Sequence, residues 1–279
     1  MRAGGAEVVR QKETPLTLEA WVGEIKSQWQ IEKIPEYEMD PEKIKHLAII
    51  CDGNRRAAVE KGLNPWDGHR AGVEVIKGIA QAGRKWNIQT LTFWVWSTEN
   101  WGRERAQVEG VMALAARHLT DTRVIEEFQK EGVKFVHLGR KDRLPKSVLS
   151  AIVSLEEQTA KYEPYTLNMA MDYGGLDEAT RGVGKIIKGI QEGSLNPELI
   201  QKNPQAILGF LDTAEQALPD LVIRTGVKEG EIPHTSGFMP LQTAYSGWVF
   251  LPDLFPNLTP EILLEPISEF VEYERRMGR

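Results

Sequence analysis

The sequence predicts a single α/β domain in which a mainly parallel β-sheet is flanked by helices. Short apolar runs rich in β-branched residues alternate with segments whose apolar residues recur at helical spacing, as in repeated strand–helix units. No linker-like stretch separates two halves of the chain, and no internal repeat is visible. The length of 279 residues is enough to bury a full hydrophobic core in one large domain.

Six apolar runs predict the strands, because each is bounded by polar turns and is long enough for a buried strand. The run HLAIIC predicts the first strand, IQTLTFWVWS the second and VKFVHLG the third. The runs YTLNMAMDY, DLVIRT and GWVFL predict the last three. The expected strands therefore cover 46–51, 88–97, 133–139, 165–173, 220–225 and 247–251.

Helical spacing predicts the segments between the strands. Val73, Ile76 and Ala80 share one face of the first such segment. Pro145 precedes the third segment, at a position where a helix start tolerates proline. The expected helices cover 69–86, 104–131, 146–161, 176–191, 197–215 and 260–277.

The first 45 residues are expected to form a helical N-terminal extension to a domain that covers 46–279. A helix is expected to start at Thr14-Pro15. Its apolar stripe consists of Leu18, Trp21, Val22, Ile25 and Trp29. Such a stripe packs on a domain or lies on a membrane surface. The polar face is not rich in lysine, which favours packing, since it carries Glu19, Glu24, Lys26 and Gln28.

Composition and charge exclude several classes of protein. The net charge of −6 argues against broad nucleic-acid binding, and we expect no nucleic-acid partner. The single cysteine, Cys51, forms no internal disulfide, which is typical of a reducing compartment. No apolar run is long enough to span a membrane, and the first residues, MRAGGAEVVRQKE, lack a signal-peptide core. We therefore expect a cytoplasmic protein.

Polar, glycine-containing clusters directly follow the first five predicted strands. They are DGNRR (52–56), STENWGR (97–103), GRKDR (139–143), MDYGG (171–175) and RTG (224–226). Ligands of open parallel sheets bind outside the carboxyl ends of the strands, so these clusters predict a binding rim. Arginine occurs in four of the five, which favours an anionic ligand.

The first cluster combines phosphate donors with a carboxylate. Phosphate oxygens accept hydrogen bonds from glycine-rich turns and from cationic side chains. Both kinds of donor are supplied by Gly53, Asn54, Arg55 and Arg56. Asp52 in the same turn would repel a phosphate unless a divalent cation lies between the two. We therefore expect a phosphate or diphosphate bridged by Mg²⁺.

Other motifs for phosphate binding or nucleophilic chemistry are absent. No G-x-G-x-x-G follows the first strand, and neither G-x-x-x-x-G-K-[ST] nor G-x-S-x-G occurs. Cys51 lies in a predicted strand and is expected to belong to the core, while His137 is expected to be a core or surface histidine and not a ligand. His69 follows Gly68 at the start of a helix that faces the rim, so it either caps this helix or contacts phosphate.

Six segments, in order, resemble the cis-prenyltransferases, whose type member is undecaprenyl diphosphate synthase. They are HLAIICDGNRRAA, GHRAG, LTFWVWSTENWGR, LNMAMDYGG, PDLVIRTG and YERRMG, and they extend from about His46 to Gly278. The resemblance implies a parallel sheet with flanking helices, a hydrophobic tunnel and a homodimer. It also implies that isopentenyl diphosphate condenses with an allylic prenyl diphosphate to form a new Z double bond. Peripheral membrane contact would arise through the product.

The resemblance also implies roles for individual residues. Asp52 would carry Mg²⁺, and the allylic diphosphate would be held by Gly53, Asn54, Arg55, Arg56 and His69. The reacting region would be lined by Ser97, Thr98, Glu99, Asn100, Trp101 and Arg103. Asp52, Asn100 and Arg103 would be catalytic, with Asn100 helping to remove a proton from the isopentenyl unit. Arg224 and Ser236 match positions that bind isopentenyl diphosphate.

Departures from the family pattern fall mainly on the second diphosphate site. His234 aligns with a family arginine, within a lengthened segment at 227–238, and is expected to bind substrate. The family's second metal-linked carboxylate falls on Gly247, so Glu229 or Glu231 would have to replace it. Each charged hydrogen bond lost here weakens binding by about 1.5–3 kcal/mol.

Two further functions therefore stay open beside prenyl transfer. A terpene cyclase or an irregular prenyl-coupling enzyme on the same fold would need only an allylic diphosphate. A non-catalytic subunit of a heteromeric prenyltransferase is disfavoured, because such subunits generally lose the aspartate that is present here as Asp52. Trp94 and Trp96 stand where the family has smaller residues and are expected to narrow the chain site, which predicts a short product.

Overall fold

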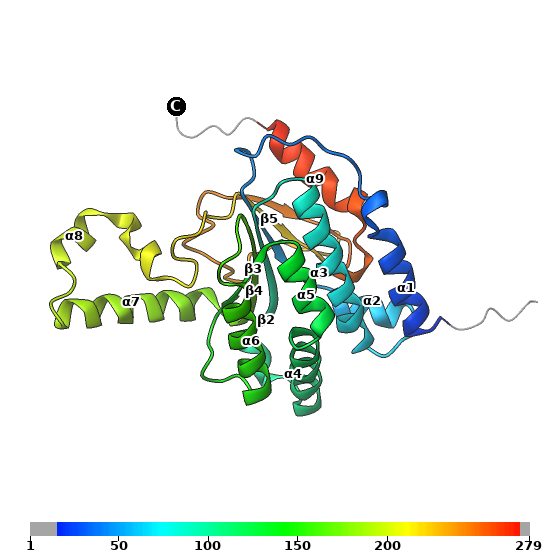
Figure 1. The fold of residues 1–279 in the computed structure, drawn as a ribbon, viewed down its shortest axis with the longest axis horizontal. Helices are drawn as coiled ribbons and strands as arrows, with labels where there is room; N and C mark the ends of the chain where they lie inside the picture. The colour runs from blue at the N-terminus through cyan, green and yellow to red at the C-terminus, as the bar shows by residue number, and fades with distance from the viewer. Residues whose placement is uncertain (1–15, 274–279) are drawn as a thin grey trace, which may run out of the picture.

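A six-stranded sheet forms the centre of the computed structural model, which describes residues 16–273 (Figure 1). All neighbouring strands are parallel, in the order β3-β4-β2-β1-β5-β6. The strands are β1 (His46–Ile50), β2 (Thr90–Ser97), β3 (Val133–Leu138), β4 (Tyr165–Tyr173), β5 (Leu221–Arg224) and β6 (Gly247–Phe250). The predicted parallel sheet flanked by helices is confirmed, and the six strands fall on the six apolar runs.

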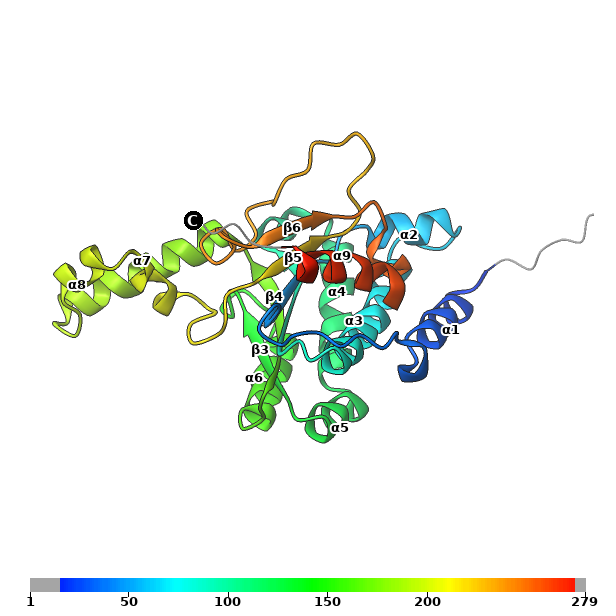
Figure 2. The same cartoon turned by 90° about the horizontal axis from the view of Figure 1, so that it is seen from above.

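The larger hydrophobic core lies between the sheet and a layer of helices. These are α1 (Leu18–Gln28), α2 (Asn54–Glu60), α3 (Asp67–Lys85), α4 (Arg105–Leu119), α5 (Thr122–Lys130), α6 (Lys146–Thr159) and α9 (Pro260–Glu272). Figure 2 shows most of them gathered on one side of the strands. A smaller cluster contains Trp94, Tyr173 and Val222 and is completed by Phe238 and Met239 from the segment after β5.

The predicted helix over 104–131 is wrong in its length, since the chain forms two helices there. Helix α4 ends at Leu119, and Asp121 then caps α5 by accepting a hydrogen bond from the backbone N–H of Arg123 at 3.0 Å. The expected helix over 197–215 is also shorter, because α8 (Pro197–Lys202) is followed by the 3₁₀ turn η3 (Pro204–Phe210). Helix α2 was not expected, and the predicted end of α9 beyond residue 273 lies outside the described residues.

Helix α1 packs on the body of the protein, which agrees with packing and not with a position on a membrane surface. Thr17 caps α1 by accepting a hydrogen bond from the backbone N–H of Ala20 at 3.2 Å, whereas Thr14-Pro15 lies outside the described residues. Trp21 and Ile25 are buried in the larger core. The Trp29 indole N–H donates to the backbone carbonyl of Leu258 at 3.2 Å. No described helix is both long and apolar enough to cross a membrane.

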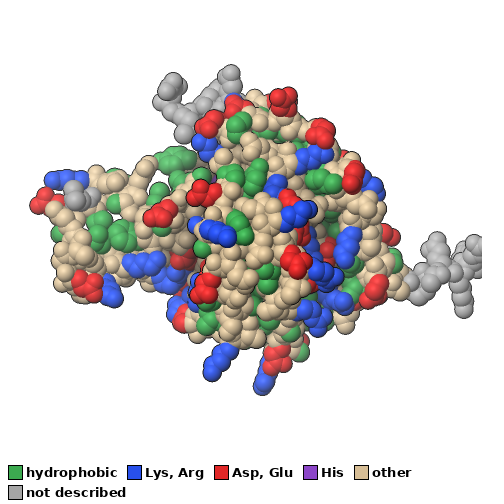
Figure 3. Space-filling view, in the orientation of Figure 1, with side chains coloured by type: hydrophobic (Ala, Val, Ile, Leu, Met, Phe, Trp, Pro, Cys, Tyr) green, Lys and Arg blue, Asp and Glu red, His purple; other side chains and the backbone are tan. Residues whose placement is uncertain are grey.

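An arm projects from the body beyond β4. Helix α7 (Gly175–Gln191) extends away from the sheet, and α8 and η3 lie beside it (Figure 1). Leu176, Val183 and Ile187 are apolar residues of α7 with exposed fractions of 80%, 44% and 51%. On the face shown in Figure 3, hydrophobic side chains in green gather over this arm. The arm therefore presents apolar surface that the described part of the chain does not cover.

A substitution at Gly78 tests how closely the segment that follows α1 packs on α3. A Cβ atom on Gly78 in α3 would lie 2.2 Å from Trp29 Cγ, so Gly78→Ala must displace a buried tryptophan. Such overpacking costs about 1–3 kcal/mol, which outweighs the helix propensity that alanine adds. We expect urea unfolding to show a lower free energy of unfolding. The matched variant Gly110→Ala in α4 has no neighbour within 4 Å and should be neutral or stabilising. Equal stability of the two variants would contradict this packing.

Candidate active site

The turn after β1 holds an accessible carboxylate among cationic side chains. Gly53 adopts a left-handed conformation with φ of 99°, and a Cβ there would approach Leu254 to 2.8 Å. This turn lets the backbone N–H of Gly53 donate to Asp52 Oδ1 at 2.6 Å. The Asp52 side chain pairs with Arg56 Nη2 and with Arg224 Nη2, each at 3.3 Å, yet stays 42% exposed. Asp52 is therefore both held in place and reachable.

The Asn54 side chain ties the start of α2 to the turn after β1. Its Nδ2 donates to the backbone carbonyl of Cys51 at 2.8 Å. Helix α3 crosses closely at Gly68 and Gly72, where a Cβ would lie 1.8 Å and 2.4 Å from oxygen atoms of Asn54. Asn54 also lines the mouth of the large pocket described below. This bond uses one of the two hydrogens of the Asn54 amide nitrogen, and binding of the allylic diphosphate by Asn54 stays a prediction.

His69, Arg55 and Arg103 form a cationic neighbourhood beside Asp52. Burial, together with the nearby charges of Arg103 and Arg55, lowers the pKa of His69 to about 4, so the ring is neutral at pH 7. Burial and repulsion from Arg55 likewise lower the pKa of Arg103 from its usual value. Within residues 16–273, neither arginine forms an ion pair with an acidic side chain. The charge of Asp52 acts on Arg103 without forming an ion pair with it, so neither arginine is neutralised by a paired carboxylate among the described residues.

Helix capping does not explain His69. The residue preceding α3 is Trp66, which makes no side-chain capping bond, and His69 lies within the first turn of the helix. The Trp66 and His69 rings stack at 6.1 Å between centroids. The buried Nε2 atom of His69 has no hydrogen-bond partner among the described residues. Of the two interpretations, contact with a ligand is the one that this geometry favours.

The turn after β2 presents Asn100 and Arg103 through a short 3₁₀ helix, η2 (Thr98–Gly102). The backbone N–H of Ser97 donates to Asn100 Oδ1 at 3.2 Å, and the Ser97 side chain completes a capping box. This arrangement occupies the amide oxygen of Asn100 and leaves its NH₂ group to donate. Thr98 and Glu99 bond to each other, with 2.9 Å between Thr98 Oγ1 and Glu99 Oε1.

A second cationic group lies across Asp52 from the first. Arg224, the last residue of β5, is 8% exposed. Its Nη1 donates to Ser236 Oγ at 2.9 Å and lies 3.1 Å from His234 Nδ1. The buried Arg224 Nε has no described partner. The lengthened segment after β5 therefore folds back so that His234 and Ser236 meet Arg224, as the family pattern implied for these three positions.

Replacement of the carboxylate missing at Gly247 by Glu229 or Glu231 stays a prediction. Gly247 begins β6 opposite Leu221, at the end of the sheet away from Asp52, and a Cβ there would lie 2.5 Å from the ring of Phe270. Glu229 and Glu231 are exposed, and Glu231 Oε2 accepts a hydrogen bond from the backbone N–H of Lys228 at 3.2 Å. No group of three or more His, Cys, Asp or Glu side chains suited to a metal occurs in the described part of the chain.

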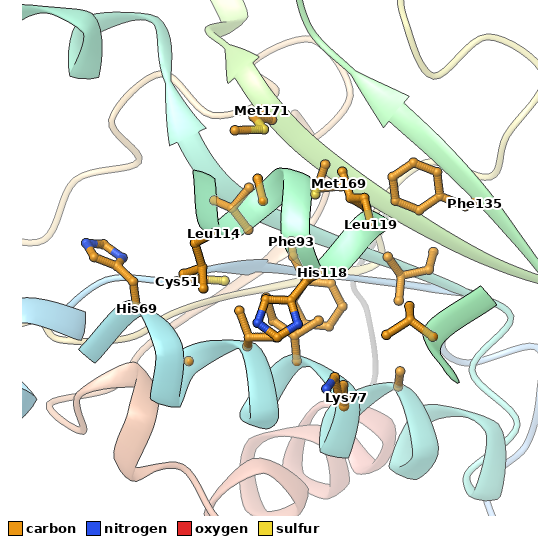
Figure 4. Close-up of a pocket in the computed structure, with 18 of the residues that line it drawn as sticks. Cys51, His69, Lys77, Phe93, Leu114, His118, Leu119, Phe135, Met169 and Met171 are labelled. Atoms are coloured by element: carbon orange, nitrogen blue, oxygen red, sulfur yellow. The ribbon is translucent and has the colours of Figure 1, made fainter. Parts of the chain in front are cut away.

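A long apolar pocket of about 190 Å³ opens beside this charge cluster. It starts at Cys51, Asn54 and His69 and runs between the sheet and helices α3 and α4 toward Phe128 and Phe135. Figure 4 shows His69 at one end and Phe135 at the other, with Phe93 and Leu114 between them. A ligand with an anionic head and a long apolar tail matches this arrangement.

Neither Trp94 nor Trp96 lines this pocket, and the short product expected from them stays a prediction. Phe93 and Val95 line the pocket instead. Trp94 points to the opposite face, where it stacks on Phe238 at 5.0 Å. A bulge at Val95 breaks the alternation of β2, because Trp94 pairs with Ala170 while Trp96 pairs with the next residue of β4. Trp96 thus returns to the larger core, where it packs on Trp101.

Sequence reasoning missed one buried polar residue of the site, Asp172. The MDYGG cluster was noted, but nothing in its pattern singled out the aspartate. Asp172 accepts a hydrogen bond from the Trp101 indole N–H at 2.8 Å and has no exposed surface. Its position at the carboxyl end of β4 was the available signal. The apolar residues of α3 and α4 that line the pocket could be predicted, because they recur at helical spacing in the sequence.

Known proteins match this chain over most of its length. The family model described as "Putative undecaprenyl diphosphate synthase" matches residues 50–278. A tritrans,polycis-undecaprenyl-diphosphate synthase (geranylgeranyl-diphosphate specific) of Thermococcus kodakarensis is 39% identical over 235 residues, which cover 84% of this chain and 87% of the relative. An isoprenyl transferase of Shouchella clausii is 36% identical over 241 residues, which cover 86% and 91% of the two chains.

The fold comparison agrees with the sequence matches. A crystal structure of lavandulyl diphosphate synthase from Lavandula x intermedia, in complex with dimethylallyl diphosphate, matches with a TM-score of 0.78 at 27% identity. The match covers 86% of this chain and 100% of that one. With the sheet, the charged rim and the apolar pocket in place, the chain belongs to the undecaprenyl diphosphate synthase family of cis-prenyltransferases.

Proposed function

We propose that this protein condenses isopentenyl diphosphate with an allylic prenyl diphosphate to form a Z-prenyl diphosphate. The observation that carries the proposal is the junction of a rim where positive charge exceeds negative charge with a long apolar pocket. The allylic diphosphate would lie at Arg55, His69 and Arg103, with its chain in the pocket. Isopentenyl diphosphate would lie at Arg224, His234 and Ser236, on the other side of Asp52.

A divalent cation fits beside Asp52, although one carboxylate alone cannot complete its coordination. Mg²⁺ is commonly held by one or two carboxylates together with substrate phosphates and water. Asp52 is the exposed carboxylate between the two cationic groups, so it would hold Mg²⁺ with the diphosphate oxygens. Bound there, Mg²⁺ would neutralise negative charge on the leaving diphosphate. We propose this magnesium dependence with substrate oxygens in place of the family carboxylate that Gly247 lacks.

Different residues of the chain would assist different parts of the reaction. The allylic C–O bond breaks, a C–C bond forms to the isopentenyl unit, and that unit loses a proton, which an oxygen of the departing diphosphate would accept. Arg103 and Arg55 would stabilise the negative charge that develops on the leaving diphosphate. Neutral His69 adds a hydrogen bond without adding charge. Asn100, whose amide oxygen is held by Ser97, would orient the isopentenyl unit through its NH₂ group and cannot itself take up the proton.

An enzyme that couples or cyclises allylic diphosphates is the second candidate. The fold is similar to that of a lavandulyl diphosphate synthase whose structure contains dimethylallyl diphosphate. Here Phe270 fills the space that a side chain at Gly247 would need, so the chain lacks a carboxylate that the family pattern has at this position. A non-catalytic subunit is disfavoured, because Asp52, Arg103 and Arg224 are present and gathered at the rim.

We also propose a cytoplasmic homodimer that meets the membrane through its product. The single cysteine supports a reducing compartment. The apolar residues Leu176, Val183 and Ile187 of α7 lie seven and four positions apart, so they form a row along one face of the helix. An exposed apolar row of this kind on a projecting helix is more typical of a protein–protein interface than of ordinary protein surface.

Division of the chain into a 1–45 extension and a 46–279 catalytic domain also stays our proposal.

Incubation with farnesyl diphosphate and Mg²⁺, with and without isopentenyl diphosphate, tests the function. We expect mass spectrometry to show products longer by whole isoprene units only when isopentenyl diphosphate is present. Asp52→Ala should lower kcat on the order of 10²–10³-fold, because charge stabilisation at the leaving diphosphate is lost. The control Glu60→Ala changes an exposed carboxylate at the end of α2 and should keep full activity. A hydrocarbon or alcohol formed from farnesyl diphosphate alone would favour the second candidate.

Product length tests which face of the sheet receives the chain. Phe128 lines the far end of the pocket and packs edge-on against Phe135 at 6.0 Å. Phe128→Ala should lengthen the product by at least one isoprene unit, since it opens space at the end of the pocket. Trp94→Phe changes the opposite face and should leave the product length unchanged. Longer products from Trp94→Phe alone would contradict this assignment and restore the original expectation for Trp94.

Charge on the arm tests the homodimer. The double variant Val183→Asp, Ile187→Asp places two carboxylates in the apolar row of α7. We expect light scattering to show the mass of one chain for this variant and of two chains for the wild type. Lys188→Glu, on a neighbouring face of the same helix, should keep the dimer. A variant that stays dimeric would show that the contact lies elsewhere.

A further inference from the structure

A buried carboxylate behind the rim has no part in the reaction described so far. Asp172 lies near the end of β4, and its side chain has no exposed surface. The Trp101 indole N–H donates to its Oδ1 at 2.8 Å, and Arg143 Nε donates to its Oδ2 at 2.9 Å. Arg143 Nη2 also donates to Oδ1. A buried carboxylate is costly unless it is fully paired, so these three side chains depend on one another.

The backbone around Asp172 fixes the carboxylate in place. Its φ of 53° lies in the left-handed region, which aspartate and asparagine tolerate better than other residues with a side chain. The backbone N–H of Arg140 donates to the Asp172 carbonyl at 3.0 Å. A Cβ on Gly139 would lie 2.7 Å from that same carbonyl oxygen, so the turn after β3 runs directly against β4. Arg143 therefore approaches Asp172 from a segment that is locked to the same strand end.

Trp101 connects Asp172 to the rim through contacts between aromatic rings. The Trp101 ring meets Trp96 edge-on, with 5.8 Å between centroids. The Arg103 guanidinium lies over the other ring of this pair, 5.3 Å from the Trp96 centroid. Within the described residues Arg103 forms no ion pair that would hold it. The Arg103 guanidinium therefore rests on Trp96, and Trp96 packs on Trp101, whose indole N–H is bound to Asp172.

We propose that Asp172 is a positioning residue that holds Arg103 against the allylic diphosphate by way of Trp101 and Trp96. The inference rests on the proposed function, because it assigns Arg103 to the leaving diphosphate. Charge stabilisation in a transition state depends steeply on placement, and a displacement of about 1 Å can cost about 100-fold in rate. The expected defect therefore falls on kcat and on diphosphate affinity at the allylic side.

Asp172→Asn and Trp101→Phe test the proposal, singly and together. Asparagine keeps the size and the backbone preference of Asp172 but removes the charge that Arg143 pairs with, so the variant is expected to fold. Phenylalanine at 101 removes the indole N–H. We expect Asp172→Asn to lower kcat about tenfold or more, with the KM for isopentenyl diphosphate within about twofold of wild type. Asp142→Asn removes an exposed carboxylate from the same turn, which pairs with Arg140, and should change neither constant.

The double variant separates positioning from a general structural role. If Asp172 acts through Trp101, Asp172→Asn should lower kcat less than about twofold further in a Trp101→Phe protein. Full additivity of the two defects, or wild-type kcat in Asp172→Asn, would overturn the proposal. A fall in melting temperature without a change in kcat would assign Asp172 to stability alone and would also overturn it.

A binding measurement keeps this proposal distinct from the proposed function. Absence of turnover by the wild type would contradict the function, and calorimetry with inorganic diphosphate and Mg²⁺ would then test the placement of Arg103. We expect Asp172→Asn to weaken diphosphate binding about tenfold and Asp142→Asn to leave it unchanged. Equal affinity of wild type and Asp172→Asn for inorganic diphosphate would overturn the proposal.

Discussion

Four arginine side chains gather near one accessible carboxylate at the carboxyl edge of the sheet. Asp52 pairs with Arg56 and Arg224 and also acts on the charge of Arg103, while Arg55 and Arg103 repel each other and form no ion pair within residues 16–273. Two like charges about 4 Å apart repel by about 4 kcal/mol at an effective dielectric constant near 20. An anion relieves this repulsion, so the rim is built for a ligand that carries several negative charges.

The order of the strands explains why these groups meet. β1 lies between β2 and β5, so the turns that follow all three strands reach the same edge. Ile50 pairs with both Trp94 and Arg224, which brings the Asp52 turn between the two flanking groups. The pocket opens from the same point along the helix-covered face. An anionic head and an apolar tail are therefore received by one continuous surface.

Much of this arrangement could be predicted from the sequence, because strand–helix alternation and polar residues at strand ends are local patterns. The features that could not be predicted depend on contacts that are not visible in local sequence patterns. The bulge at Val95 reverses the face of Trp96, which no alternation rule in the sequence signals. The break between α4 and α5 depends on Asp121 acting as a cap within an otherwise helical run. The importance of Asp172 appears only when β4, the η2 turn and the turn after β3 lie together.

A crystal structure with Mg²⁺ and the unreactive analogue farnesyl thiolodiphosphate would test the central claim most directly. We expect the diphosphate group among Arg55, His69 and Arg103, with the metal between it and Asp52. The farnesyl chain should run along Phe93 and Val95 toward Phe128. A chain bound on the opposite face against Trp94, or a diphosphate bound away from Arg55 and Arg103, would contradict the account.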